Sequence, residues 1–178
     1  MRKMNALISL FICSLSTACF AVPQRNSHVN KMPSPEEVTQ EVDKIGARAF
    51  VLNLGDSSKK WRYIINKIST GQDEWLELVP RLSVPGLGGG HEDLESALAE
   101  AIPGNAQGVM NVIDKTDNLS IEQVCAMPIY NKSIAKQNEY VVNSMQSLYK
   151  VHTITAQKCL DHLIDVVKQA PPFSTESL

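Results

Sequence analysis

The sequence offers little support for an activity on nucleic acid or within a membrane. It has 17 Lys and Arg residues against 19 Asp and Glu residues, so its net charge of −2 provides no basic surface for a phosphate backbone. Beyond the N-terminal residues, no apolar run approaches the roughly 20 residues that span a bilayer. We therefore expect neither a nucleic-acid partner nor a transmembrane segment.

Alternation of apolar and polar residues, the pattern of a half-buried strand, is also missing. Apolar residues instead recur every three or four positions, which is the period of an amphipathic helix. This pattern predicts an all-α protein: a single domain of about seven or eight helices packed as antiparallel pairs, either as a bundle or as a short helical-repeat-like stack. The helical domain is expected over residues 34–170, between a flexible leader (22–33) and a C-terminal tail (171–178).

The first 21 residues have the composition of a bacterial export signal. Two basic residues precede the apolar run Ala6–Leu15, and small residues lead to a cleavage site after Ala21. Because the run is too short to span a bilayer, we expect the segment to be removed and the chain to reach the periplasm. A lipoprotein modified at Cys19 is the alternative. Ser16 argues against it, because a leucine-like residue usually stands three positions before a lipid-modified cysteine.

Cysteine is scarce, with four residues in the chain, and two of them fall within the export signal. The other two, Cys125 and Cys159, are expected to form one disulfide in an oxidising compartment. A free catalytic thiol is the alternative interpretation, but neither cysteine lies in a recognisable nucleophile motif.

Capping residues and helix breakers predict where several helices begin and end. The SPEE run at residues 34–37 predicts a helix start, and one apolar face continues from it to Gly55. Farther along, Pro103 and Gly104 stop a helix, and Asn105 can cap the next one. The C-terminal apolar stripe includes His152, which we interpret as a hydrogen-bonded core histidine. A break is expected where Thr153 can cap a second helix.

The segment VPGLGGGHED, residues 84–93, concentrates glycine beside a histidine and two acids. It lacks the GK[ST] of a phosphate loop and the βαβ context of a dinucleotide fingerprint, and it reverses the HGGG order of a lipase oxyanion loop. Its acids would repel an anion at a helix N-terminus. We interpret it as a joint between two helices that can also bind a partner. The expected contact residues are Leu87, Gly88, Gly89, Gly90, His91, Glu92 and Asp93.

Metal-ligand and cofactor motifs are also missing. HExxH and the other common ligand spacings do not occur. Asp161, His162 and Asp165 lie close together on one expected helix, but their spacing matches no known set of ligands. We therefore expect no metal and no cofactor, and we assign no catalytic residue.

Three segments between Asp73 and Pro128 carry a resemblance to a group of known proteins: WLELVPRL, ALAEAIPGNAQGVMNVID and the cysteine-containing VCAMP. This part of the chain is similar to a type of small exported bacterial protein with an all-helical fold. The resemblance implies export and a helical fold. It implies no activity and no residue roles.

These features favour a periplasmic protein that binds another protein and has no catalysis of its own. A small, acidic, disulfide-bonded helical domain suits an immunity or inhibitor protein that occludes the active site of an envelope-targeted toxin or hydrolase. The 87–93 segment and nearby acids would cover the cleft of that partner. Two alternatives are an envelope scaffold with an extended groove and an enzyme that uses His91 with Glu92 or Asp93.

Overall fold

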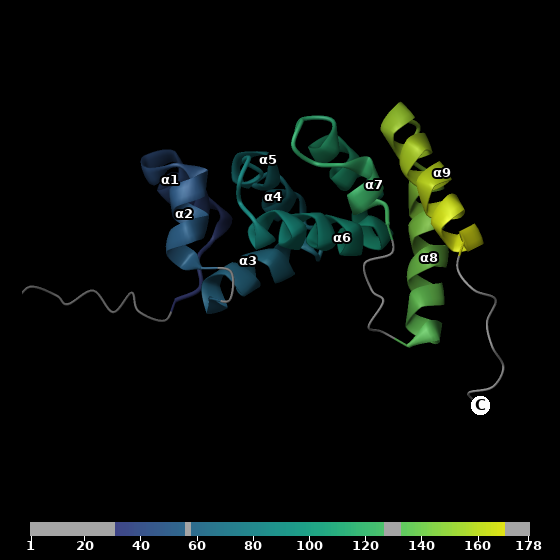
Figure 1. The fold of residues 1–178 in the computed structure, drawn as a ribbon, viewed down its shortest axis with the longest axis horizontal. Helices are drawn as coiled ribbons and strands as arrows, with labels where there is room; N and C mark the ends of the chain where they lie inside the picture. The colour runs from purple at the N-terminus through teal and green to yellow at the C-terminus, as the bar shows by residue number, and fades with distance from the viewer. Residues whose placement is uncertain (1–30, 56–57, 127–132, 170–178) are drawn as a thin grey trace, which may run out of the picture. The chain divides into compact units, whose positions relative to one another are not determined.

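The computed structural model describes residues 31–55, 58–126 and 133–169. The chain divides into two units, residues 1–31 and 32–178, and only the second is described in any length. The expected export signal, almost all of the leader and the C-terminal tail lie outside the described residues. Within these residues every regular element is a helix, which confirms the all-α prediction (Figure 1). The helices are α1 (Pro35–Ile45), α2 (Ala47–Leu54), α3 (Lys59–Ile68), α4 (Asp73–Leu76), α5 (Val79–Leu82), α6 (Gly89–Ile113), α7 (Ile121–Val124), α8 (Ile134–Tyr149) and α9 (Ile154–Gln169).

The first predicted helix is in fact two helices. Its start is as expected, because the Ser34 side chain accepts a hydrogen bond from the backbone N–H of Glu37, and the Glu37 carboxylate accepts one from the Ser34 N–H. The continuous helix up to Gly55 is wrong. Gly46 has a φ of +84°, a left-handed value that glycine adopts without strain, and it turns the chain between α1 and α2. After this turn Leu52 no longer continues the buried face of α1 and is 59% exposed.

The helix breakers farther along act in different ways. Pro80 is the second residue of α5, where its missing N–H has no helical partner to lose, so it begins a new turn after α4. Asn105 has φ −153° and ψ 66°, and its side-chain oxygen accepts a 2.9 Å hydrogen bond from the N–H of Gly108. The expected stop and cap at this point therefore produce a kink within α6, with helix on both sides of it.

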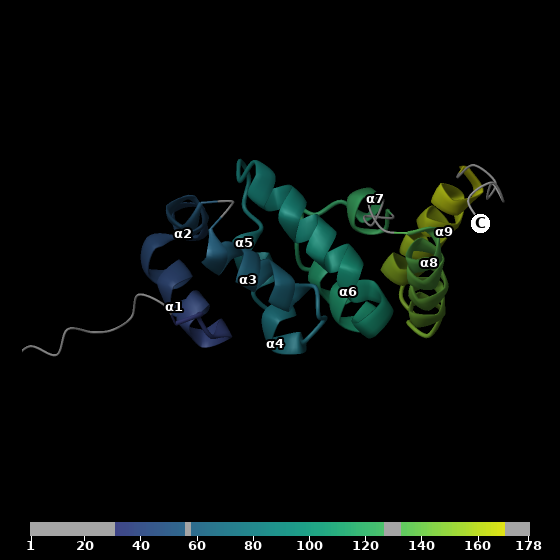
Figure 2. The same ribbon diagram turned by 90° about the horizontal axis from the view of Figure 1, so that it is seen from below.

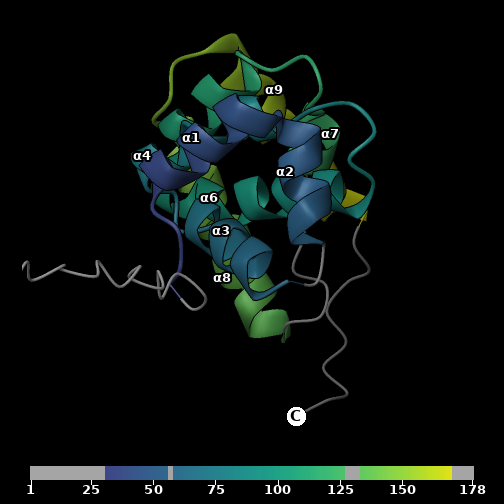
Figure 3. The same cartoon turned by 90° about the vertical axis from the view of Figure 1, so that its left-hand side faces the viewer.

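The kinked helix α6 is the centre of the described unit. It packs against α3, α4 and α5 on the N-terminal side and against α7, α8 and α9 on the C-terminal side. Figures 1 and 2 show α1 and α2 at one end of this unit and the α8–α9 pair at the other, with α6 between them. Seen from the α1–α2 end in Figure 3, α3 and α6 lie behind these two helices. No helix in the described ranges combines the length and the apolar character needed to cross a bilayer.

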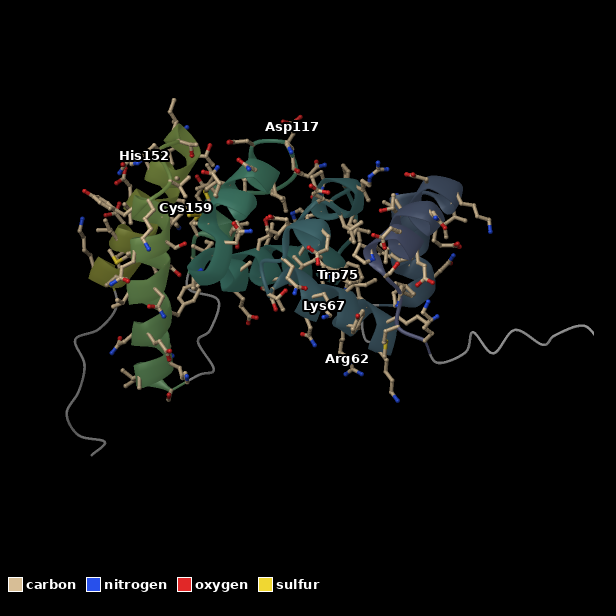
Figure 4. All side chains as sticks on the ribbon, turned by 180° about the vertical axis from the view of Figure 1, so that it is seen from behind. Arg62, Lys67, Trp75, Asp117, His152 and Cys159 are labelled. Atoms are coloured by element: carbon tan, nitrogen blue, oxygen red, sulfur yellow. A yellow bond between two sulfur atoms is a disulfide. The ribbon has the colours of Figure 1, made fainter. Side chains whose placement is uncertain are left out.

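The C-terminal region confirms one expectation and corrects another. The chain breaks between α8 and α9 where predicted, and the Thr153 hydroxyl accepts a 3.1 Å hydrogen bond from the N–H of Ala156. His152 lies in this connection and is exposed (Figure 4). Its interpretation as a core histidine is therefore wrong, because the break removes it from the apolar stripe of the helix.

The predicted disulfide is confirmed. Cys125 follows α7 and Cys159 lies in α9, with a Cα–Cα distance of 5.3 Å and a bond between the two sulfur atoms. Both residues are buried, at 1% and 0% exposure. The bond therefore fastens the α8–α9 pair to the segment that leaves α6.

Candidate functional site

The glycine stretch is a packed turn between α5 and α6. Gly86 and Gly88 have φ values of +78° and +58°, which reverse the chain before α6 begins. Leu87, between them, is only 4% exposed and belongs to the core. At Gly90 a Cβ atom would lie 3.0 Å from Leu87 Cδ2 and 3.2 Å from Val51 Cγ1. Two of these glycines thus serve the turn, and Gly90 allows the first turn of α6 to pack closely.

Asp93 has a structural contact. Its carboxylate accepts a 2.7 Å hydrogen bond from the indole N–H of Trp61, whose side chain is fully buried. A buried indole N–H without an acceptor is destabilising, so Asp93 satisfies a polar group that the core of α3 would otherwise leave unpaired. This contact joins the start of α6 to α3.

His91 contacts a different acid from the two that the sequence suggested. Its Nε2 lies 3.4 Å from Glu95 Oε1, one turn farther along α6. Glu95 is 8% exposed and also accepts a 3.4 Å hydrogen bond from the backbone N–H of Ser120. Glu95 was not among the site residues predicted from the sequence, although its position four residues after His91 on a helix was an available signal.

Only part of the expected contact segment is open to a partner. Gly88, Gly89 and Glu92 are exposed, His91 and Asp93 are half-buried, and Leu87 and Gly90 are buried. His91 lies beside the buried carboxylate of Glu95 within α6, while Glu95 and Asp93 accept hydrogen bonds from Ser120 and Trp61 of neighbouring segments. The accessible portion can contribute to a binding surface at its edge.

A second candidate site is a polar trough over α1, α4, α5 and the C-terminal half of α6. It consists of two adjoining clefts with volumes of about 580 and 470 Å³, and Glu77 and Arg81 line both of them. Leu76, Leu78 and Val112 contribute apolar surface to its walls. We call this surface the trough; its charged residues are Glu36, Asp73, Glu74, Glu77, Arg81 and Lys115.

The kink in α6 shapes the larger cleft of the trough. The Asn105 amide donates hydrogen bonds of 2.8 Å to the Gly71 carbonyl and 2.7 Å to the Asp73 carboxylate, which holds Asp73 at the edge of the cleft. Gly108, one turn later, allows α6 to pack closely here: a Cβ atom there would lie 2.6 Å from Asn105 Nδ2 and 2.7 Å from Leu76 Cδ1. Asn105 and Gly108 thus set how α4 and α6 meet beside this cleft.

The trough carries an excess of negative charge. Arg81 pairs with Asp43 at 2.5 Å, which offsets the charge of the guanidinium. Within the described part of the chain, Glu74, Glu77 and Lys115 take part in no ion pair. These exposed groups can pair with charged groups of a ligand, and the carboxylates favour a cationic one.

Glu36 is also ionised at neutral pH. The Ser34 hydroxyl donates a 2.8 Å hydrogen bond to the Glu36 carboxylate, and together with a backbone hydrogen bond it lowers the pKa of that group. This residue adds a fixed negative charge at the α1 end of the trough.

Among the described residues, no three His, Cys, Asp or Glu side chains are grouped so that they could hold a metal ion.

The trough was missed from the sequence because its residues come from four elements between positions 35 and 115. The one local signal was the density of acids in PEE at 35–37 and in DEWLE at 73–77, which also suits the first turns of helices.

Comparison with known proteins gives no match: no family model, no curated protein and no solved structure is significantly similar to the chain.

Proposed function

We propose that this protein is exported to the periplasm, loses its signal after Ala21, and binds another protein there without catalysing a reaction. The observation that carries this proposal is the trough. It combines unpaired carboxylates with apolar walls on a scaffold of packed helices. A surface of this kind suits a protruding segment of a partner that carries Lys or Arg.

Contacts within the trough that form without a partner support binding. The ion pair between Arg81 and Asp43 and the two hydrogen bonds of the Asn105 amide hold its walls before any partner arrives. Preorganised walls reduce the conformational entropy lost on binding. The excess of carboxylates adds long-range attraction for a basic partner, which raises the association rate and makes it depend on ionic strength.

The concrete form of the proposal is an immunity or inhibitor protein. A toxin or hydrolase that acts in the envelope would insert a basic segment beside its active site into the trough. The bulk of the helical unit would then block the active-site cleft. The exposed part of the glycine segment, at Gly88, Gly89 and Glu92, lines neither cleft of the trough and would be a separate contact surface.

The test begins with capture from envelope extract by the immobilised chain in three forms: wild type, Glu77→Lys and Glu41→Lys. Glu77 lines both clefts, whereas Glu41 is exposed on α1 and lines neither. We expect one partner that binds the wild type and Glu41→Lys equally and binds Glu77→Lys at least about tenfold more weakly, because charge reversal opposes a cationic segment. The hydrolytic activity of that partner should fall in proportion as the wild-type chain is added.

Three outcomes would contradict parts of this proposal. A partner that binds Glu77→Lys normally would remove the trough as the binding surface. A trough-dependent partner with unchanged activity at saturation would replace inhibition with a scaffold role. A reaction catalysed by the chain itself, and abolished by His91→Ala, would support an enzyme instead.

A further inference from the structure

The cations of the chain are unevenly placed, although the chain as a whole is acidic. Six of its 17 Lys and Arg residues fall between positions 44 and 72, where Asp56 is the one acid. Four of the six lie on α3, and we call them the basic face: Lys59, Lys60, Arg62 and Lys67. The expectation of no basic surface, drawn from the net charge, is therefore wrong at this helix.

The basic face is on the side of α3 that turns away from the core. The opposite side packs into the core through its fully buried side chains, Trp61, Ile64 and Ile68. Three of the four cations are exposed, and the half-buried Lys67 has its Nζ 5.8 Å from the centre of the Tyr63 ring. Figure 4 shows Arg62 and Lys67 on α3, at the edge of the unit. Within the described ranges, none of the four takes part in an ion pair, so their charge can act on a partner.

The placement of these cations opposes the stability of their own helix. Lys59 and Lys60 are the first two residues of α3, at the positive end of the helix dipole. Four other helices, α1, α4, α6 and α7, carry at least one acid in the first turn, whereas α3 carries none. A charge that disfavours its own helix is typical of a residue with a role outside the fold.

We propose that the basic face binds the anionic headgroups of a phospholipid membrane. A Lys or Arg side chain near such a surface is attracted by the lipid phosphates, and each strengthens binding by about fivefold. The contact should be electrostatic and reversible, because the apolar side chains of α3 are buried in the core and do not enter the bilayer. No residue of α3 lines the trough, so a chain held in this way keeps the trough open to a partner.

The composition of the face favours a lipid surface over an acidic protein. Three of its four cations are lysines, which are depleted at protein interfaces, where Arg and aromatic residues are enriched. The neighbouring aromatic rings of Tyr63 and Trp75 pack edge to face with their centres 5.7 Å apart, so they are used within the fold and do not serve as anchors for a partner. Neither the trough nor the cleft between α8 and α9 includes a residue of α3. A layer of headgroups needs no cleft to receive it.

Sedimentation with vesicles tests this inference, using the full chain expressed with its own N-terminus. The wild type should sediment with vesicles of phosphatidylethanolamine and phosphatidylglycerol and should stay in solution with vesicles of phosphatidylcholine. In a double variant, Lys59→Glu with Lys60→Glu, we expect binding to be at least about 25-fold weaker, since two attractive charges are lost. Raising the salt from roughly 0.05 to 0.5 M should release the wild type, because it shortens the range of charge interactions.

Two controls separate the basic face from net charge and from folding. Lys150→Glu with Lys158→Glu changes the net charge equally, at exposed positions after α8 and on α9, and should bind vesicles like the wild type. Thermal unfolding should show that Lys59→Glu with Lys60→Glu is at least as stable as the wild type, because acids suit the first turn of a helix. A loss of vesicle binding in that variant then cannot come from unfolding.

A fluorophore can report on α3 itself. It is attached to Asn66→Cys, an exposed position one turn after Arg62, and in a separate chain to Asn143→Cys on α8. We expect phosphatidylglycerol vesicles to shift the emission of the label at position 66 and to leave the label at position 143 unchanged. This measurement is independent of residues 1–21, whose basic and apolar residues can also bind lipid where they are retained.

Two outcomes would overturn the inference. One is equal vesicle binding by the wild type and the α3 double variant, with no shift of the label at position 66. The other is tighter binding to duplex DNA or to polyglutamate than to vesicles, lost in the same variant, because the face would then serve nucleic acid or an acidic protein. Neither result bears on whether the trough binds a partner.

Discussion

Reduction of the disulfide between Cys125 and Cys159 should remove a large share of the stability of the fold. The bond closes a loop with a sequence separation of 34 residues. Loop-closure entropy for this length corresponds to about 3.8 kcal/mol at 25 °C, lost when the unfolded chain is freed. Domains of this size have total unfolding free energies of roughly 5–15 kcal/mol, so the loss should amount to between about a quarter and three quarters of the total.

The structure indicates why the loss is global. Cys125 and Cys159 are both buried and belong to the same apolar core as Trp61 and Trp75. Loosening α9 from α7 would also weaken the packing of α8 and α9 on α6, since these helices share contacts. Urea unfolding followed by tryptophan fluorescence, with and without a reductant, measures the difference, because both indoles report on the N-terminal half of the core.

A double variant, Cys125→Ala with Cys159→Ala, serves as the control. Its unfolding midpoint should be low and should not respond to the reductant. A decrease of less than about 1 kcal/mol on reduction of the wild type would refute the loop-entropy reasoning. A loss of α8–α9 structure with unchanged tryptophan fluorescence would instead show that the bond stabilises one part of the unit locally.

Three further predictions concern side chains whose surroundings are well defined. Asp93→Ala should lower the unfolding free energy by about 1–3 kcal/mol, because it leaves the buried indole N–H of Trp61 without an acceptor. Asp93→Asn keeps an acceptor and should lower the unfolding free energy less. Equal losses for the two variants in urea titrations would contradict this reasoning. Gly108→Ala should destabilise the fold by about 1–3 kcal/mol, since its Cβ would lie 2.6 Å from Asn105 Nδ2 and 2.7 Å from Leu76 Cδ1. A more stable variant in urea titrations would show that these side chains move aside easily. Burial raises the pKa of Tyr140 to about 12, above its unfolded value near 10. The contribution of the neutral phenol to the unfolding free energy should therefore be complete below pH 10. It should fall by roughly 2–3 kcal/mol between pH 10 and pH 12. Tyr140→Phe should remove this decrease from the pH dependence of the unfolding free energy.

Local patterns in the sequence were enough to predict many helix ends. The capping hydroxyls of Ser34 and Thr153 lie where the sequence placed helix starts, because a cap acts within three residues of chain. Gly46 was overlooked for the same reason that Gly90 was hard to interpret. A glycine has the same identity in a turn, in a helix and at a close contact, and only the backbone angle and the neighbouring atoms distinguish these uses.

The candidate sites were much less predictable than the helices. The sequence singled out residues 87–93 because glycine, histidine and acids are concentrated there, but folding buries Leu87 and Gly90 and bonds Asp93 to Trp61. The trough has no local signature, since its walls join α1 to the end of α6. For α8, helical spacing alone could not tell the side that packs on α6 from the side that faces solvent.

The sequence by itself determined the all-α class, the pairing of Cys125 with Cys159 and several helix ends. These follow from periodicity, from a choice of two cysteines and from caps that act over a single turn. The tertiary structure decided which polar groups are used up within the fold and which are left for a partner. His91 and Glu95 contact each other, while Glu77 lies open in the trough. That distinction depends on which atoms of distant segments come within hydrogen-bonding distance, and only the packing of the helices around α6 sets those distances.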